Sequence, residues 1–359
     1  MTYRVVQWAT GAMGRACLRG VIDHPGTELV GLYAYGANKV GKDAGDIARR
    51  EPTGVIATNS VDEILALDAD VVIHAARLGP YGSHDADFIP LLEAGKNVIS
   101  INGYSWPNYW ANERIEALEA ACQKGGSTLM AAGLNPGFVG EQLAVVASGL
   151  TAALEHVQIT ENADGREIRD PDYLFGALGF GADPSSIDPN DPTWRPVAGL
   201  NGMYEDSIAS IARELGMTMD RVETDHRLHL APRDLDTAAG VVPKGTVSHT
   251  NWRWNGIVDG KPKITLSIHW YIDTTHLNQP DPPLWEVDIK GHPGVSVSMT
   301  LGKHPLDASR ASAEEYALAA TVLNTIPHVV AAPPGIASRP PVTAYRDAYS
   351  SPHPLLASV

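Results

Sequence analysis

The chain begins with the stretch Tyr3-Arg4-Val5-Val6-Gln7-Trp8-Ala9-Thr10-Gly11-Ala12-Met13-Gly14-Arg15, in which an apolar strand leads into small residues. A helix is predicted over Ala16–Ile22, so the small residues form a strand-to-helix turn. Their pattern is A-x-G-x-x-G, the dinucleotide-binding fingerprint with its first glycine replaced by Ala9. Gly11 would let the backbone approach a pyrophosphate, and Gly14 would let the helix pack closely on the sheet. The helix N-terminus would add N–H donors and partial positive charge.

This stretch therefore predicts a turn that binds the phosphates of a nicotinamide cofactor. A turn whose residues are small only for packing is the alternative, and the repeated strand–helix units that follow favour the cofactor. The residues assigned to this turn are Thr10, Gly11, Ala12, Met13, Gly14 and Arg15.

Strands and helices alternate through the first 135 or so residues. Several of the strands are continuous Val/Ile runs, which is typical of parallel strands buried on both faces. The pattern predicts an α/β fold, a doubly wound parallel sheet of the Rossmann type. The expected strands are Arg4–Ala9, Leu29–Tyr35, Val55–Thr58, Val71–Ala75, Val98–Ile101 and Thr128–Ala132.

The rest of the chain differs in character. Residues 160 to 200 are rich in Asp, Pro and Gly, and strands separated by turn signals run from Val247 to Leu301. We expect a dinucleotide-binding domain over 1–140, an α+β substrate and dimerisation domain with an open antiparallel sheet over 141–304, and a C-terminal helix and strap over 305–359 that return to the first domain. Ser312 and Glu315 form a capping box for that helix, which is expected to end at Pro327. Because an open sheet must cover its apolar face, a homodimer through the sheet is expected.

Composition excludes some classes of function. The formal charge is −15, with 27 basic and 42 acidic residues, which argues against a nucleic-acid surface. No apolar run reaches the length of a membrane helix, and the N-terminus has no signal-peptide pattern. The two cysteines, Cys17 and Cys122, are expected to be core residues of a cytoplasmic protein without disulfides. No metal site is expected, since His226 and His229 are interpreted as scattered surface histidines.

The residues after the second strand bear on the choice of cofactor. NAD-specific proteins usually place Asp or Glu there to bond the ribose 2′-hydroxyl, and this chain has Asn38 and Lys39 instead. Together with Arg15, these donors and cations favour NADP(H), with NAD(H) possible. Ala75 and Ala76, after the fourth predicted strand, would let the nicotinamide half approach.

Four segments carry a family resemblance across most of the chain. They are Trp8–Arg15, Val40–Gly45, Ala132–Phe138 and Val322–Pro327. In this order they resemble the 2,4-diaminopentanoate dehydrogenase and native amine dehydrogenase family, whose N-terminal domain is often described as dihydrodipicolinate reductase-like. The resemblance implies a Rossmann domain, a substrate domain with a dimerising sheet, and NAD(P)-dependent oxidoreduction at a carbon–nitrogen bond.

The chain departs from these relatives in two places. It lacks the adjacent histidines and the lysine of authentic dihydrodipicolinate reductases, so that activity is rejected. Amine dehydrogenases of the family place a glutamate just after the strand that corresponds to Val98–Ile101, where it deprotonates the nitrogen nucleophile. Here Asn102 and Gly103 follow that strand, and asparagine cannot accept a proton at neutral pH.

Several side chains remain candidates for chemistry. Tyr104 is expected to donate a hydrogen bond to charge that develops on the substrate, and Asn102 to orient it, although both residues could be purely structural. Glu141 is the nearest acid that could replace the glutamate, with a role at a helix start as the alternative. Asn135 would reach the nicotinamide or substrate, and its alternative is a turn residue. Tyr173 and Trp106 are expected in an apolar substrate pocket.

The sequence thus predicts an NADP-preferring oxidoreductase that acts on a small amine/ketone centre. Two other functions stay open. One is a carbonyl or imine reductase that needs no ammonia, with Tyr104 as proton donor. The other is a cofactor-binding sensor without catalysis.

Overall fold

The computed structural model describes residues 2–338, apart from residues 278 and 308. The chain forms two compact units. Unit 1 contains Met1–Leu78, Gly82–Phe138 and Leu301–Val359, and unit 2 contains Gly79–Tyr81 and Val139–Thr300. The end of the predicted C-terminal strap, residues 339–359, lies outside the described residues. Within the described part of the chain, no helix has the length and apolarity needed to cross a membrane.

Unit 1 is built on a six-stranded parallel sheet in the order β15-β5-β4-β3-β1-β2. The parallel sheet confirms the predicted Rossmann-type fold. Its strands are β1 (Tyr3–Trp8), β2 (Thr27–Tyr33), β3 (Val71–His74), β4 (Asn97–Ser100), β5 (Thr128–Ala131) and β15 (Gly335–Ala337).

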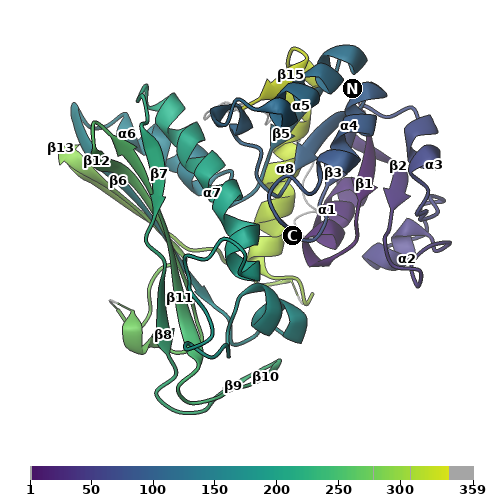
Figure 1. Ribbon diagram of the computed structural model, residues 1–359. Coiled ribbons are helices and arrows are strands. Elements are labelled where there is room, and N and C mark those ends of the chain that lie inside the picture. The colour runs from purple at the N-terminus through teal and green to yellow at the C-terminus, as the bar shows by residue number, and fades with distance from the viewer. Residues whose placement is uncertain (1, 278, 308, 339–359) are drawn as a thin grey trace. The chain divides into compact units, whose positions relative to one another are not determined.

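Helices cover both faces of this sheet (Figure 1). On one face α1 (Ala12–Asp23) packs on α8 (Ala313–Ala331), and their apolar side chains join those of the strands in one core. On the other face α4 (Asp85–Glu93) packs on α5 (Glu113–Gly125). The short helices α2 (Ala44–Ala48), α3 (Val61–Ala66) and η1 (Pro107–Tyr109) lie in the connections. Both cysteines are free and buried, as the sequence predicted.

Two local predictions for unit 1 were wrong. Val55–Thr58 forms only isolated bridges, at Ile56 and Thr58, and no strand of the sheet. Helix α8 begins at the predicted Ser312 cap but continues through Pro327 to Ala331. A proline in a helix interior removes one backbone donor, and here the packing of Val322, Ile326 and Val329 on the sheet outweighs that loss.

Unit 2 is built on a seven-stranded sheet in the order β14-β13-β6-β12-β11-β7, with β8 also paired to β11. The sheet is mixed and not purely antiparallel, because β6 and β12 run parallel. Its strands are β6 (Ala153–Asp164), β7 (Arg221–Thr224), β8 (Arg227–Leu230), β11 (Val247–Val258), β12 (Lys261–Tyr271), β13 (Trp285–His292) and β14 (Val295–Met299). The remaining elements are η2 (Val139–Ala144), α6 (Val145–Ser148), η3 (Asp172–Ala177), α7 (Arg195–Glu214), the pair β9 (Leu235–Thr237) and β10 (Gly240–Val242), and η4 (Thr274–His276).

The two faces of the unit 2 sheet differ in polarity. Helix α7 packs on β11 and β12 and covers the face that carries Ile159, Trp254 and Leu266. The opposite face carries the alternate residues, among them Gln158 and Ser267. The expectation that a dimer is needed to cover an apolar face was therefore wrong in its premise, since α7 already covers that face.

Candidate active site

The turn between β1 and α1 is as tight as the fingerprint predicts. Ala9 adopts the left-handed conformation, with φ of +73°, at the position where the fingerprint usually has glycine. A Cβ on Gly14 would lie 2.4 Å from the Ala9 carbonyl oxygen, so only glycine allows this approach of helix to strand. The buried Gln7 side chain donates to the carbonyls of Trp8 and Ala9, both at 3.1 Å, and so stabilises the turn.

The N-terminus of α1 is open to an anion. Gly11 occupies the N-cap position without a side-chain cap, and the first helical turn holds no acidic residue. Nothing lies within 4 Å of a Cβ placed on Gly11, and Ala12 beside it is exposed. The first N–H groups of a helix need acceptors, and here no side chain of the helix supplies one. These features fit the pyrophosphate of a dinucleotide.

Two cations lie close to this turn. The Lys39 ammonium donates to the Thr10 carbonyl at 2.7 Å and to Thr10 Oγ1 at 2.9 Å. Burial lowers the pKa of Lys39, and the positive charge of Arg15 lowers it further. Asn38 is exposed next to Lys39. Such a pair of cations suits a phosphate group.

The loops after β3 and β4 are joined by Asn102. Its Nδ2 donates to the Ala76 carbonyl at 2.9 Å and lies 3.4 Å from His84 Nε2. Ala75 and Ala76 are buried. The carboxyl ends of parallel strands form the ligand-binding edge of such sheets, so Asn102 lies at that edge.

Tyr104 is a buried anchor of the loop after β4. Its side chain is 1% exposed, and its hydroxyl donates to Asp85 Oδ1 at 2.5 Å. The Arg114 guanidinium lies 5.2 Å from the ring centroid and also binds Asp85. Burial and the Asp85 charge raise the pKa of Tyr104. A role as proton donor to a substrate would require this hydrogen bond to break, so the geometry favours a structural role.

His74, His84 and Asp87 form a cluster that the sequence did not predict. Asp87 Oδ2 accepts from His74 Nε2 at 3.1 Å and from the Tyr35 hydroxyl at 3.1 Å, and it lies 3.9 Å from His84 Nδ1. One ligand atom from each member lies within 4.8 Å of the others, a spacing compatible with a metal ion. Asp87 already accepts hydrogen bonds from His74 and Tyr35, so the cluster is held together by hydrogen bonds. A histidine directly at the end of β3 was the signal in the sequence.

Asn135 and Trp106 lie in unit 1, in the loops that follow β5 and β4. The turn around Asn135 is closed by two glycines, since a Cβ on Gly133 would lie 2.4 Å from the Pro136 carbonyl oxygen and Gly137 has φ of +124°. Trp106 is half-buried and precedes η1. Both therefore remain candidates at the edge of the parallel sheet.

Glu141 and Tyr173 belong to unit 2, where they interact with Tyr204. Glu141 is 7% exposed in η2, and Tyr173 is 39% exposed in η3. Burial raises the pKa of Tyr204, and the charges of Glu161 and Glu141 add to this effect. Glu161 was missed, although a charged residue among the inward-facing positions of a strand is a signal. Its carboxylate accepts from Trp285 Nε1 at 2.8 Å and from Trp270 Nε1 at 3.1 Å.

The interpretation of His226 as a surface residue was wrong. His226 is 4% exposed, and its Nδ1 accepts from the Arg253 N–H at 3.0 Å. Its Nε2 lies 2.9 Å from Asn201 Oδ1. These contacts hold a neutral core histidine, and burial lowers its pKa to about 4. His229 stacks on His276, with ring centroids 4.5 Å apart.

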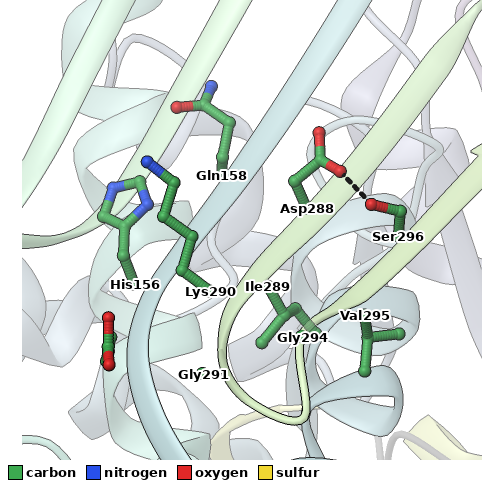
Figure 2. A pocket seen from close by; sticks show the side chains of 10 residues that line it. His156, Gln158, Asp288, Ile289, Lys290, Gly291, Gly294, Val295 and Ser296 are labelled. Atoms are coloured by element: carbon green, nitrogen blue, oxygen red, sulfur yellow. Dashed lines mark hydrogen bonds between the residues drawn. The ribbon is translucent and has the colours of Figure 1, made fainter.

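An open pocket of about 810 Å³ lies on the polar face of the unit 2 sheet, lined by β6, β13 and β14. Figure 2 shows His156 and Lys290 at one side of it and Asp288, hydrogen-bonded to Ser296, at the other. Its lining contains none of the candidate residues, so it is separate from the site considered for chemistry.

Comparison with known proteins supports the family resemblance. Residues 5–78 match the family described as dihydrodipicolinate reductase, N-terminus, and residues 196–346 match the 2,4-diaminopentanoate dehydrogenase C-terminal domain. An amine dehydrogenase of Streptomyces virginiae is 26% identical over 320 residues, which are 86% of this chain and 85% of that protein.

Solved structures agree in fold. An amine dehydrogenase from Mycobacterium smegmatis has a TM-score of 0.77 at 19% identity and covers 94% of this chain and 95% of its own. Biliverdin reductase from Synechocystis sp. PCC 6803, in complex with biliverdin and NADP+, has a TM-score of 0.51 at 14% identity over 90% of each chain. The chain therefore carries a C-terminal domain of the 2,4-diaminopentanoate dehydrogenase type and is similar to amine dehydrogenases over most of its length, with Asn102 where that resemblance leads us to expect a glutamate.

Proposed function

We propose that this protein is an NAD(P)H-dependent oxidoreductase that interconverts a small ketone and the corresponding amine. The observation that carries the proposal is the likeness to the Streptomyces virginiae amine dehydrogenase, because it extends over 86% of the chain. The uncapped start of α1 beside Gly11 supports the cofactor half of the proposal. A bound nicotinamide would supply the hydride, and the chain would supply orientation and proton transfer.

NADP(H) is proposed as the preferred cofactor. The support is the proximity of Lys39 and Arg15 at the Thr10 turn, since two cations suit the extra phosphate of NADP(H). The residues from Tyr35 to Lys39 contain no carboxylate that would repel that phosphate.

A carbonyl or imine reductase that needs no ammonia is the second candidate. Asn102 favours it, because its amide cannot accept the proton that ammonium must lose before it attacks a carbonyl. The test is NADPH oxidation with a panel of small ketones and aldehydes, each with and without high ammonium. Oxidation only with ammonium supports the amine dehydrogenase, and oxidation independent of ammonium supports the reductase. Bound NADPH without oxidation would favour the sensor.

Two further properties are proposed. A homodimer could form through the polar face of the unit 2 sheet, which carries both signs of charge, as at Lys290 and Asp288, and can therefore pair with its own two-fold copy. Light scattering should give a dimer mass for the wild type and a monomer mass for Gln158→Arg. A cytoplasmic location is proposed from the two free, buried cysteines.

A further inference from the structure

We propose that His84 takes over the role of the missing glutamate and accepts the proton of the nitrogen nucleophile during reductive amination. This inference rests on the proposed amine dehydrogenase function. The His74–His84–Asp87 cluster would then take part in the reaction, at the edge of the parallel sheet where β3 and β4 end.

His84 lies beside the position at which the glutamate is expected. His84 Nε2 lies 3.4 Å from the side-chain amide of Asn102, the residue that stands where the glutamate is expected. A proton acceptor on His84 would thus lie within one hydrogen bond of that position. His84 is also the accessible histidine of the cluster, since its side chain is 14% exposed and that of His74 is fully buried.

The contact with Asn102 indicates which nitrogen of the neutral His84 ring carries the proton. Asn102 Nδ2 donates one hydrogen to the Ala76 carbonyl, and because an amide nitrogen can only donate, its 3.4 Å contact with His84 Nε2 makes Nε2 the acceptor. Nε2 is therefore the nitrogen with the lone pair, and Nδ1 carries the proton of the neutral ring. An ammonium ion that takes the place of the Asn102 amide could therefore donate a hydrogen bond to His84 Nε2.

The charged and polar groups around His84 favour its role as a base. The groups that face His84 are His74 on β3, Asp85 and Asp87 on α4, the Arg77 backbone carbonyl and the Asn102 amide. Burial lowers the pKa of His84, and His74 lowers it further, which keeps the ring neutral and able to accept a proton at pH 7. The Asp87 carboxylate, 3.9 Å from Nδ1, acts in the opposite direction and would stabilise the imidazolium once it forms.

In the proposed reaction His84 takes up one proton and later returns it. Nε2 takes a proton from ammonium, and the lone pair of the resulting ammonia forms the C–N bond with the carbonyl carbon. A proton then moves from nitrogen to the former carbonyl oxygen. The imidazolium returns its proton to that hydroxyl group, which leaves as water while the iminium forms. Hydride from the nicotinamide reduces the iminium to the amine, and His84 ends neutral, as it began.

Other groups of unit 1 fit this role less well. Asn102 has no basic lone pair at neutral pH, and the Tyr104 hydroxyl is engaged with Asp85. His74 Nε2 is engaged with Asp87. Among the described residues near Asn102, His84 is the base with an available nitrogen.

The test compares two substrates in His84→Gln, which keeps a hydrogen-bonding side chain but no base. With ketone and ammonium, kcat should fall about 100-fold or more, the usual size of a general-base effect. With a preformed cyclic imine such as 2-methyl-1-pyrroline, which needs no ammonium deprotonation, kcat should stay within about threefold. His304→Gln, an exposed histidine change, is the matched control and should alter neither rate.

Equal losses on both substrates, or no loss on either, would overturn the role of His84. Absence of ammonium-dependent turnover in the wild type would instead overturn the proposed function, and the inference with it. A second readout needs no substrate. Nitrogen-15 spectra of the histidine rings at pH 7, with His84 assigned by its loss in the variant, should show a neutral ring protonated on Nδ1; an imidazolium, or a proton on Nε2, would contradict the proposal.

Discussion

The Tyr104 hydroxyl donates a 2.5 Å hydrogen bond to the Asp85 carboxylate, which joins the loop after β4 to the first turn of α4. Tyr104 has φ of +77°, a conformation that bulky residues adopt only when their surroundings enforce it. The hydrogen bond and the Arg114 guanidinium beside the ring provide that enforcement. Tyr104 therefore fixes the loop that carries Asn102.

We predict that Tyr104→Phe reduces the free energy of unfolding by about 2 kcal/mol, because it removes a buried hydrogen bond to a charged acceptor. Turnover should persist, since the ring and the loop remain. Urea unfolding and steady-state kinetics check the two parts. Normal stability with loss of turnover would restore Tyr104 as the proton donor.

Cofactor preference should depend on Lys39 and Arg15. We predict that Lys39→Ala and Arg15→Ala each reduce the preference for NADPH over NADH by about tenfold or more, because each loses a charge-assisted contact to the 2′-phosphate. Titration of cofactor fluorescence measures both dissociation constants. Lys124→Ala, whose ammonium pairs with Glu93, is the control and should leave the ratio unchanged. An unchanged ratio in the first two variants would refute this account of cofactor choice.

The turn after β1 offers a matched pair of substitutions. Gly14→Ala should destabilise the protein by about 1–3 kcal/mol and weaken cofactor binding, since its Cβ would lie 2.4 Å from the Ala9 carbonyl oxygen. Ala9→Gly should raise stability or leave it unchanged, because the left-handed φ suits glycine. Thermal unfolding with and without NADPH checks both, and a tolerated Gly14→Ala would show that the turn is less tight than described.

Acid should destabilise unit 2 through its buried histidines. Burial, with nearby His269, lowers the pKa of His249 from 6.5 to about 3. The unfolded chain therefore binds a proton that the folded chain does not, so stability is fully present above pH 6.5 and falls as pH decreases towards 3. Each such histidine contributes a slope of about 1.4 kcal/mol per pH unit.

His249→Gln should accordingly reduce the slope of the unfolding free energy against pH between 6.5 and 4.5 by about 1.4 kcal/mol per pH unit, because one proton fewer is taken up on unfolding. Urea unfolding at several pH values measures the slope. His304→Gln should keep the wild-type slope, and an equally steep slope in His249→Gln would mean that His249 is protonated in the folded state.

The sequence predicted what depends on local pattern. The turn around Gly11 and Gly14, the buried strands of the parallel sheet and the Ser312 cap of α8 all appear in the structure, because each is encoded by neighbouring residues. Long-range packing decided the exceptions. Pro327 stays helical because its flanking residues pack on the sheet, and Val55–Thr58 meets only the end of β2, at Tyr33, and the loop residue Asp43.

The candidate site was predictable only in part for the same reason. Asn102 and Lys39 follow predicted strands, so their place at the sheet edge follows from topology. His84 and Asp87 lie in a helix and its cap, and only folding brings them to Asn102. Spacing along the chain gave no sign of that contact, nor of the two indole N–H groups that bind Glu161.

The most direct test of the central claim follows the nitrogen atom of ammonium into the product. Purified protein is incubated with a small ketone, NADPH and ¹⁵N-labelled ammonium, and the product is identified by mass spectrometry. The account predicts one equivalent of ¹⁵N-labelled amine for each NADPH oxidised. An alcohol without nitrogen, formed at the same rate when ammonium is left out, would contradict it and make the protein a carbonyl reductase.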